Sequence, residues 1–377
     1  MKISCLQENL AKGLNTVNRA VSPRSTLPVL GNVLLAVENG RLKLSATNLE
    51  IVITCWIGAT VTETGSTTVP ARTFSELINT FPQERVDLSL NKTTETLHVS
   101  CGRTQANVKG IDANEFPVIP DPDHENRIRM EPAVLKRAIS QVAFAAATDD
   151  SRPSLTGVLT SFEGSRVTMA ATDGFRLSVR SAHIAGYVEK PFSVIIPARA
   201  LNEVARIISD DLDAVYISMP AGRNQIIFDM DNVLLVSQLI DGKFPDYAPI
   251  IPSTLNTRTV LNTAEFTKAC RTADIFARES SNTARVSVEP GDGLSQAYAT
   301  IAANSKETGD NVAQVDATVD GMPVEIAFNV KFMADALGVI DTPQVALETT
   351  SPHEPGVLMP VGDNDFVHII LPMNFNR

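Results

Sequence analysis

The chain has 377 residues, of which 44% are hydrophobic and 20% charged, and its formal net charge is −11. This length suits two or three domains, and the apolar fraction excludes a disordered chain. The acidic balance argues against a protein that adheres to nucleic acid over its whole surface, because Lys and Arg supply most of that affinity. Net charge does not say, however, where the positive residues lie.

Cysteines and histidines offer no catalytic or metal-binding pattern. Cys5, Cys55, Cys101 and Cys270 lie far apart without a CxxC pair, so we expect small buried hydrophobes in a reducing compartment. The five histidines have no metal-ligand spacing, and we expect neither metal nor cofactor. No apolar run reaches the length of a membrane span, and residues 1–10 do not resemble a signal peptide. A cytoplasmic protein without membrane contact is expected.

The first predicted element is an amphipathic helix that recurs twice. Its apolar residues follow helical spacing, and the same stripe reappears 125 residues later and again 131 residues after that. The three stripes are Leu10, Leu14 and Val17; Leu135, Ile139 and Val142; and Phe266, Cys270 and Ala273.

A second predicted helix also recurs. "TVPARTFSELI" and "IIPARALNEVA" place Pro70 and Pro197 just before a helix-like pattern, where a missing N–H costs nothing. "AFNVKFMADAL" is the third copy. Between the two helices each copy alternates apolar and polar residues, and residues 33–53 with Asn39-Gly40 at their centre have the pattern of a β-hairpin.

Phe-Pro steps followed by more prolines close the first two copies, at Phe116-Pro117 and Phe244-Pro245. The sequence therefore predicts three α+β domains of similar plan, at residues 1–122, 123–252 and 253–377. Such repetition favours a surface built by symmetry over one deep active site.

Basic residues fall on equivalent positions of these repeats. The first helix carries Lys12, Arg137 and Lys268, and the second carries Arg72, Arg199 and Lys331. One interpretation is that exposed helix positions are often Lys or Arg. The other is that all six helices line a common face that holds duplex DNA by its phosphates, without reading sequence. With one Trp and four Tyr, single-strand binding by stacking is disfavoured.

Four segments, "SPRSTLPVLGNVLL", "ATDGFRLSV", "LIDGKFPDYAPIIP" and "HIILPM", resemble bacterial DNA polymerase III beta subunits, the sliding clamps, in their order and spacing. The resemblance covers the whole chain. It implies a head-to-tail homodimer that closes six similar domains into a ring, with helices lining the hole and antiparallel sheets outside. Duplex DNA would thread the ring, which would tether the polymerase as a non-catalytic processivity subunit of a DNA-directed DNA polymerase.

The resemblance also implies site residues. Arg24 matches a residue that touches DNA, and Arg103 a basic residue near the rim and the subunit boundary. A mainly apolar groove would take hydrophobic anchors of peptides from the polymerase III alpha subunit, clamp-loader subunits and other clamp-binding proteins. Its residues would be Leu155, Thr172, Gly174, Phe175, Arg176, Leu177, Pro245, Ile250, Ile369, Ile370, Leu371, Pro372 and Met373.

The implied dimer contact sets Ala106 and Val108 of one copy against Ile275 and Phe276 of the other, with Arg103 near an acid such as Glu307 or Asp310. These apolar residues could equally belong to an ordinary core. The groove departs from the family pattern at Phe175, Pro249 and Asn374, where histidine, arginine and a basic residue are common. We therefore expect a more apolar rim.

Asp173, in "ATDGFRLSV", could be a catalytic or metal-binding carboxylate or only the start of a turn. The segment offers no partner acid, base or metal ligand, and the equivalent residue in the first repeat is Asn48, so a turn is predicted instead. The chain contains no nucleotide-binding or hydrolase motif. Two alternatives stay open: a metal-dependent phosphoryl-transfer enzyme using Asp149-Asp150 or Asp210-Asp211, and a protein scaffold that does not bind DNA.

Overall fold

The computed structural model describes residues 1–377 except 23–26, 221, 253, 292–294 and 374–377. The chain forms two compact units, one made of residues 1–133 and 203–239 and the other of residues 134–202 and 240–377. The helices are α1 (Gln7–Val17), α2 (Ala71–Thr80), α3 (Pro132–Val142), α4 (Ala198–Ile207), α5 (Thr263–Ala277) and α6 (Val330–Leu337).

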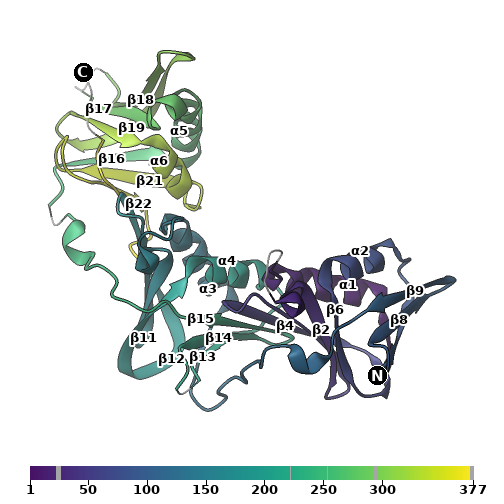
Figure 1. Cartoon of the computed structure of the whole chain (residues 1–377). Coiled ribbons are helices and arrows are strands. Elements are labelled where there is room, and N and C mark those ends of the chain that lie inside the picture. The colour runs from purple at the N-terminus through teal and green to yellow at the C-terminus, as the bar shows by residue number, and fades with distance from the viewer. Residues whose placement is uncertain (23–26, 221, 253, 292–294, 374–377) are drawn as a thin grey trace. The chain divides into compact units, whose positions relative to one another are not determined.

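The predicted amphipathic helices are confirmed. Leu10, Leu14 and Val17 of α1 are fully buried, and the corresponding residues of α3 and α5 are buried as well. Within each unit the helices of one repeat lie side by side, α1 with α2 and α5 with α6 (Figure 1). Pro70 and Pro197 directly precede α2 and α4, each as the last residue of a strand.

The first unit contains two antiparallel sheets. The larger one has the pairing order β6–β2–β3–β4–β15–β14–β13–β10, so strands from the first and second repeats join in one sheet. The other is five-stranded, in the order β5–β1–β7–β8–β9. The strands are β1 (Lys2–Leu6), β2 (Asn32–Glu38), β3 (Arg41–Thr47), β4 (Ile51–Gly58), β5 (Thr60–Glu63), β6 (Ser66–Pro70), β7 (Arg85–Asn91), β8 (Thr96–Cys101), β9 (Thr104–Lys109), β10 (Arg127–Met130), β13 (Val215–Ser218), β14 (Gln225–Met230) and β15 (Val233–Gln238).

The second unit is built in the same way. β12 pairs with β11 and β23, and the sheet continues through β22, β21 and β16, while β20, β17, β18 and the first part of β19 form another sheet. The strands are β11 (Gly157–Thr172), β12 (Arg176–Pro197), β16 (Thr257–Asn262), β17 (Thr283–Glu289), β18 (Tyr298–Ser305), β19 (Gly309–Gly321), β20 (Val324–Asn329), β21 (Gln344–Thr349), β22 (Gly356–Pro360) and β23 (Phe366–Ile370).

The predicted hairpin of residues 33–53 is present in the first repeat. Asn39 and Gly40 both have positive φ (49° and 74°), as the tight turn between β2 and β3 requires. In the second repeat the equivalent segment lies within β11, whose pairing with β12 shifts register on either side of Gly164, a residue with φ 57°. Leu159 packs against the cluster that contains Ala170, so the two halves of β11 lie close together.

All four cysteines are free and buried, as predicted. Burial raises the pKa of Cys5 to about 12 and the pKa of Cys55 to about 11. Thiols this reluctant to ionise are packing residues, because the thiolate is the reactive form.

Candidate functional site

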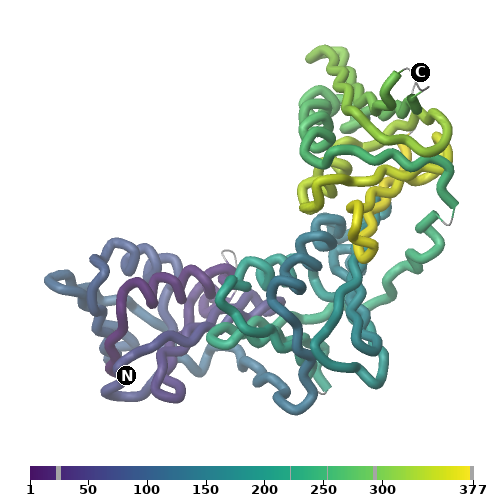
Figure 2. The backbone as a smooth tube through the Cα atoms, turned by 180° about the vertical axis from the view of Figure 1, so that it is seen from behind, coloured from purple at the N-terminus to yellow at the C-terminus, as the bar shows by residue number. Residues whose placement is uncertain are grey.

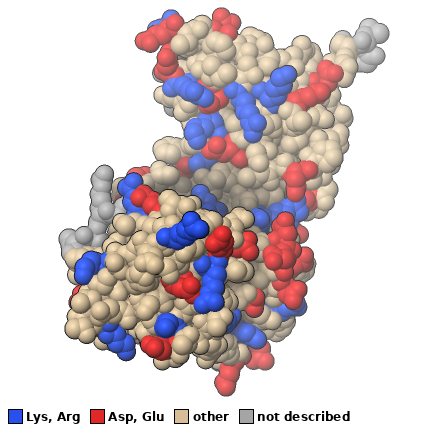
Figure 3. Space-filling model, turned by 90° about the vertical axis from the view of Figure 1, so that its right-hand side faces the viewer, with Lys and Arg blue, Asp and Glu red and all other residues tan. Residues whose placement is uncertain are grey.

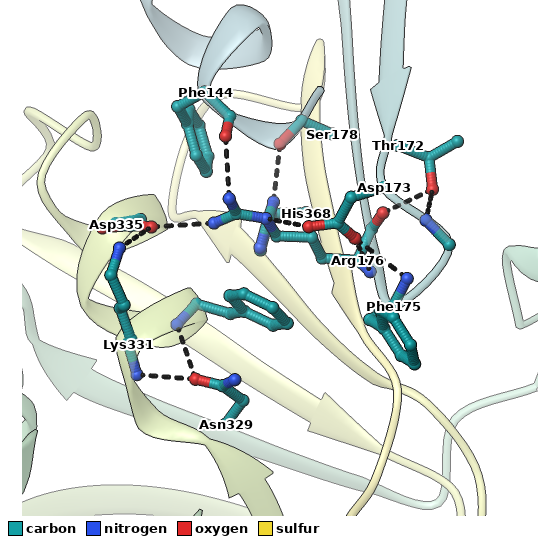
Figure 4. Close-up of polar contacts among 12 residues, drawn as sticks. Phe144, Thr172, Asp173, Phe175, Arg176, Ser178, Asn329, Lys331, Asp335 and His368 are labelled. Atoms are coloured by element: carbon teal, nitrogen blue, oxygen red, sulfur yellow. Dashed lines mark hydrogen bonds and ion pairs between the residues drawn. The ribbon is translucent and has the colours of Figure 1, made fainter. Parts of the chain in front are cut away.

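The turn between β11 and β12 is held by two of its own side chains (Figure 4). Asp173 Oδ1 accepts hydrogen bonds from the N–H groups of Phe175 (2.9 Å) and Arg176 (3.1 Å). Thr172 Oγ1 accepts from the Gly174 N–H (3.0 Å) and donates to the Arg176 carbonyl (2.6 Å). Gly174 has φ 94°, a conformation that favours glycine. The prediction that Asp173 forms a turn is confirmed.

The first repeat builds the same turn without a charge. Asn48 Oδ1 accepts from the N–H groups of Glu50 (3.0 Å) and Ile51 (2.8 Å). Thr47 Oγ1 accepts from the Leu49 N–H (3.0 Å) and donates to the Ile51 carbonyl (2.8 Å). Leu49 has φ 76°, as Gly174 has a positive φ in the second repeat. The amide oxygen of Asn48 accepts the same two backbone hydrogen bonds as the Asp173 carboxylate. The turn therefore requires a hydrogen-bond acceptor at this position, and not an acid or a base.

Arg176 links this turn to the third repeat. Its guanidinium donates to Asp173 Oδ2 (3.0 Å), to Asp335 Oδ2 on α6 (2.8 Å) and to the Phe144 carbonyl (2.9 Å) (Figure 4). It lies over the Phe332 ring, 4.3 Å from the centroid. The side chain is only 9% exposed. Such a charge must keep its partners, because a buried charge without them is costly.

Ser178 and His368, which lie opposite each other on β12 and β23, are fully buried. β12 pairs with β23, which sets Leu177 beside Ile369 and Ser178 beside His368. The ring Nδ1 of His368 lies 2.6 Å from Ser178 Oγ. Burial, with the nearby positive charge of Arg176, lowers the pKa of His368 to about 3. The imidazole is therefore neutral at physiological pH and serves as a core residue.

The predicted groove residues come together around these strands. The backbone trace shows the C-terminal strand beside β12 (Figure 2), and the Leu371 N–H donates to the Phe175 carbonyl (2.9 Å). Leu155 packs with Ile195 and Phe244 in a neighbouring apolar cluster. Pro245 and Ile250 are exposed, on the segment that follows β15.

Two of the predicted groove residues lie at its margin. The Met373 N–H donates to the Ala327 carbonyl of β20 (2.8 Å), and Met373 lines a different groove with Arg285 and Val312. Pro372 is half-buried. Asn374, expected to alter the groove rim, lies outside the described residues.

Lys12 and Lys268, at equivalent positions of the first helix, are both exposed. Lys12 lines a groove of about 1020 Å³ in the first unit, together with Arg19, Arg41 and Arg206. Lys268 lines a groove of about 660 Å³ in the second unit, together with Arg271. Basic side chains therefore gather around the predicted ones.

Sequence reasoning missed all four of these basic residues. Helical spacing could have indicated Arg19, Arg206 and Arg271, but not Arg41, which lies on β3. Arg19 follows Lys12, and Arg206 follows Arg199, by seven residues, which is two helical turns and hence the same face. Arg271 follows Lys268 by three residues, also on one face.

The second-helix positions are exposed but partly engaged. Arg72 forms an ion pair with Glu76 (2.8 Å), and Lys331 with Asp335 (3.4 Å). Arg199 is exposed on α4, and Arg103 is exposed in the turn that precedes β9. Arg24 lies outside the described residues. On the face shown in Figure 3, basic and acidic side chains are interspersed.

Arg137, a predicted DNA contact, also joins elements of the second unit. Its guanidinium lies 2.7 Å from Asp341 and 3.2 Å from Asp363. Asp363 is shared with Arg180, 2.5 Å away. Burial by itself would raise the pKa of Asp363. Hydrogen bonds from Arg180 and the Asp365 N–H, with the charges of both arginines, hold that pKa below its ordinary value of 3.8.

Replacing Asp363 by asparagine is expected to lower the free energy of unfolding by about 2 kcal/mol at pH 7, because Arg180 loses a poorly exposed partner. A carboxyl whose pKa is depressed by folding stabilises the native state above its unfolded pKa, and loses that effect as the pH falls through the folded value. The difference between Asp363→Asn and the unchanged chain should therefore close below about pH 4.

Urea denaturation at several pH values measures this difference. Asp341→Asn is the control, since the Asp341 side chain is 66% exposed and should matter little. If Asp363→Asn remained less stable than the unchanged chain at low pH, the stabilising role of the Asp363 carboxylate would be contradicted.

The predicted dimer residues differ in exposure. Ala106 and Val108 lie on β9, the edge strand of its five-stranded sheet, but Ala106 is half-buried and Val108 is buried in the free chain. Ile275 is exposed on α5, and Phe276 packs partly against the core of the third repeat. Val312, which was not among the predicted residues, is exposed on β19.

The acidic pairs considered for metal binding lie on exposed loops. Asp149, Asp150, Asp210 and Asp211 are all exposed, and Asp149 hydrogen-bonds to Ser151. Within the described ranges, no group of three His, Cys, Asp or Glu side chains is arranged to hold a metal ion. No helix in the described part of the chain is long and apolar enough to cross a membrane.

Comparison with known proteins gives matches along the whole chain. Residues 1–120 match the N-terminal domain of the DNA polymerase III beta subunit, residues 129–246 its central domain and residues 248–374 its C-terminal domain. A beta sliding clamp of Staphylococcus aureus is 32% identical over 384 residues, covering 99% of either protein, and one from Staphylococcus epidermidis is 31% identical.

Solved structures agree. The DNA polymerase sliding clamp of Bacillus subtilis superimposes with a TM-score of 0.93 at 29% identity, covering 100% of this chain and 99% of that one. The DNA polymerase III subunit beta of Pseudomonas aeruginosa gives a TM-score of 0.91 at 28% identity, covering both chains completely. The three-domain fold of helices and antiparallel sheets, the repeated turns and these matches together show that the chain belongs to the bacterial DNA polymerase III beta subunits, the beta sliding clamps.

Proposed function

We propose that two copies of this chain close into a ring around duplex DNA and tether the replicative polymerase without catalysing a reaction themselves. The observation that carries the proposal is the equivalent placement of Lys12 and Lys268 on α1 and α5. Both helices bury an apolar stripe and leave these cations exposed, on a chain with a net charge of −11. Cations spread in this way attract phosphates without reading bases.

A ring requires no tight grip on DNA, because escape requires the ring to open. Weak, water-mediated attraction permits sliding, whereas many close phosphate contacts would hold the protein in place. Arg72, Arg137, Arg199 and Lys331 are proposed to contribute to this attraction, with Arg24 and Arg103. The ion pairs of Arg72 and Lys331 are surface pairs that a phosphate can exchange into at small cost.

Two sheet edges support a head-to-tail dimer. β9 is an edge strand with exposed Arg103 and Lys109 at its two ends. Residues 309–316 of β19 pair only with β18 in the described sheet, and Asp310 and Asp316 lie there. Opposite charges on two unpaired edges favour antiparallel addition of one strand to the other. Ala106 and Val108 would then meet Ile275 and Phe276 of the second copy.

The groove formed by β12, β23 and the turn at Thr172–Arg176 is the proposed docking site for peptides of the polymerase alpha subunit, the clamp loader and other clamp-binding proteins. Phe175 is 61% exposed and Pro249 is exposed, so the rim offers apolar surface where charge is common in the family. We further propose domain boundaries at residues 122 and 252 and a cytoplasmic location, where replication takes place.

Linearising the DNA tests the ring. The chain, loaded by its clamp loader onto a nicked circular plasmid, is expected to stay with the plasmid during gel filtration and to be lost once a restriction enzyme cuts the circle. Only an enclosing ring slides off free ends. Linear DNA with both ends blocked by streptavidin is the control and should retain the protein. Equal retention on circular and open-ended linear DNA would refute enclosure.

A further inference from the structure

The apolar lining of the proposed docking groove is covered in the free chain. Leu155 is 5% exposed, Leu177 1%, Ile369 1% and Ile370 2%. A hydrophobic anchor gains affinity by removing apolar surface from water, and these side chains have almost none left to offer. Some part of the chain must therefore move before a peptide can contact them.

Two apolar clusters hold three of these residues, whereas Ile370 belongs to the core of the third repeat. Leu155 lies in one, with Ala147, Ile195 and Phe244, and Leu177 and Ile369 lie in the other. Two side chains pack against both clusters, Leu159 and Tyr247. Leu159 is held in β11, opposite Ile195 of β12. Tyr247 is the one of the two that lies outside a strand.

Tyr247 belongs to a surface segment, residues 241–252, that follows β15 and runs outside the sheets (Figure 2). Apart from buried Phe244 and half-buried Tyr247, residues 241–250 are exposed. The backbone bonds at its end are local, from the Ile250 N–H to the Tyr247 carbonyl and from the Ile251 N–H to the Ala248 carbonyl. Two aromatic side chains therefore fasten this segment.

The side chains of Phe244 and Tyr247 differ in how deeply they are buried. Phe244 is 7% exposed and belongs to the cluster itself. Tyr247 is half-buried and meets Phe244 edge-on, with centroids 6.4 Å apart and the rings at 83°. Within the described part of the chain, its hydroxyl makes no hydrogen bond. Its ring can leave without breaking a polar interaction, while Phe244 keeps the segment attached.

We infer that Tyr247 fills, in the free chain, the apolar space that the hydrophobic anchor of a docking peptide takes, and that binding displaces its ring. This inference rests on the proposed docking groove. Tyr247 competes with the peptide, so the observed affinity is the intrinsic affinity reduced by the fraction of open chains. The competition selects for anchors that fill the space better than a tyrosine ring does.

Peptide affinity of Tyr247→Ala tests the inference. The probe is a fluorescein-labelled hexapeptide with two leucines and a C-terminal phenylalanine, followed by fluorescence anisotropy with the full-length dimer. Tyr247→Ala is expected to bind it about tenfold more tightly, mainly through faster association, because the open fraction rises. Weaker or unchanged binding would overturn the inference, since Tyr247 would then be a wall of the site or have no part in it.

Two variants serve as controls. Tyr247→Phe should match the unchanged chain, because the hydroxyl makes no hydrogen bond to any residue that the structure describes. Tyr187→Ala removes a 75% exposed tyrosine from β12 that packs against neither cluster, and should also match. If Tyr187→Ala also bound the peptide more tightly, the increase in peptide affinity would not be specific to Tyr247.

A second measurement tests the inference even if Tyr247→Ala does not fold. The chain has four tyrosines, so 3-fluorotyrosine labelling gives few ¹⁹F resonances, and Tyr247→Phe identifies the relevant one. Peptide addition should move that resonance to a solvent-exposed position, and an unmoved resonance with bound peptide would overturn the inference. If neither the unchanged chain nor any variant bound the peptide, the proposed docking groove would be wrong together with this inference. The proposal that two copies enclose DNA would not be affected, because retention on circular DNA tests it separately.

Discussion

Replacing Lys12 and Lys268 together by glutamate is expected to reduce loading onto nicked circular DNA about a hundredfold at physiological salt, and the salt dependence of loading should become shallower. Both lysines are exposed at equivalent positions of α1 and α5, and no ion pair holds either side chain within the described residues. In a ring of two copies the double substitution would reverse four charges on the proposed DNA-facing surface. Fluorescently labelled protein co-eluting with plasmid measures the loading.

The matched control is Lys92→Glu with Lys190→Glu. These lysines are exposed on the turn after β7 and on β12, outside all six helices, and the substitution changes net charge by the same amount. It should leave loading within about twofold, because a distant exposed charge is largely screened at physiological salt. If both double variants lost loading equally, overall charge and not the helices would determine DNA retention. That result would contradict the proposed DNA-facing surface.

Replacing Arg176 by methionine is expected to cost about 3–4 kcal/mol of unfolding free energy, since it removes one member of a buried charge network and leaves the others unpaired. The guanidinium donates to two carboxylates and a carbonyl and lies over Phe332. Asp173 would keep its turn hydrogen bonds, so most of the loss should arise at Asp335 and Phe144. Urea denaturation followed by circular dichroism measures the change.

Arg166→Met is the control for that substitution. Arg166 pairs with Asp365 at 2.5 Å, but the two side chains are 45% and 43% exposed, so its removal should cost less than about 1 kcal/mol. Adding Asp335→Asn to Arg176→Met should recover part of the stability, because the carboxylate left unpaired is then neutral. If the two arginine variants were equally stable, Arg176 would not be the structural link described above.

The helical elements could be predicted because their information is local. The stripe of Leu10, Leu14 and Val17 repeats every three to four residues, and that spacing places the side chains on one helix face whatever lies opposite. The turn at Asp173 was equally readable, because an Asx side chain bonds to backbone two and three residues ahead.

By itself, the sequence determined the three repeats, the stripes that build their helices, and the turns, because each of these depends on residues a few positions apart. Only the tertiary structure decided what the polar side chains do. Arg176 meets Asp335 at a separation of 159 positions, and Arg137 reaches Asp341 across 204. Tyr247, on an exposed irregular segment, covers two apolar clusters. No local pattern encodes such pairings, because they form only where strand pairing and packing bring distant segments to the same place.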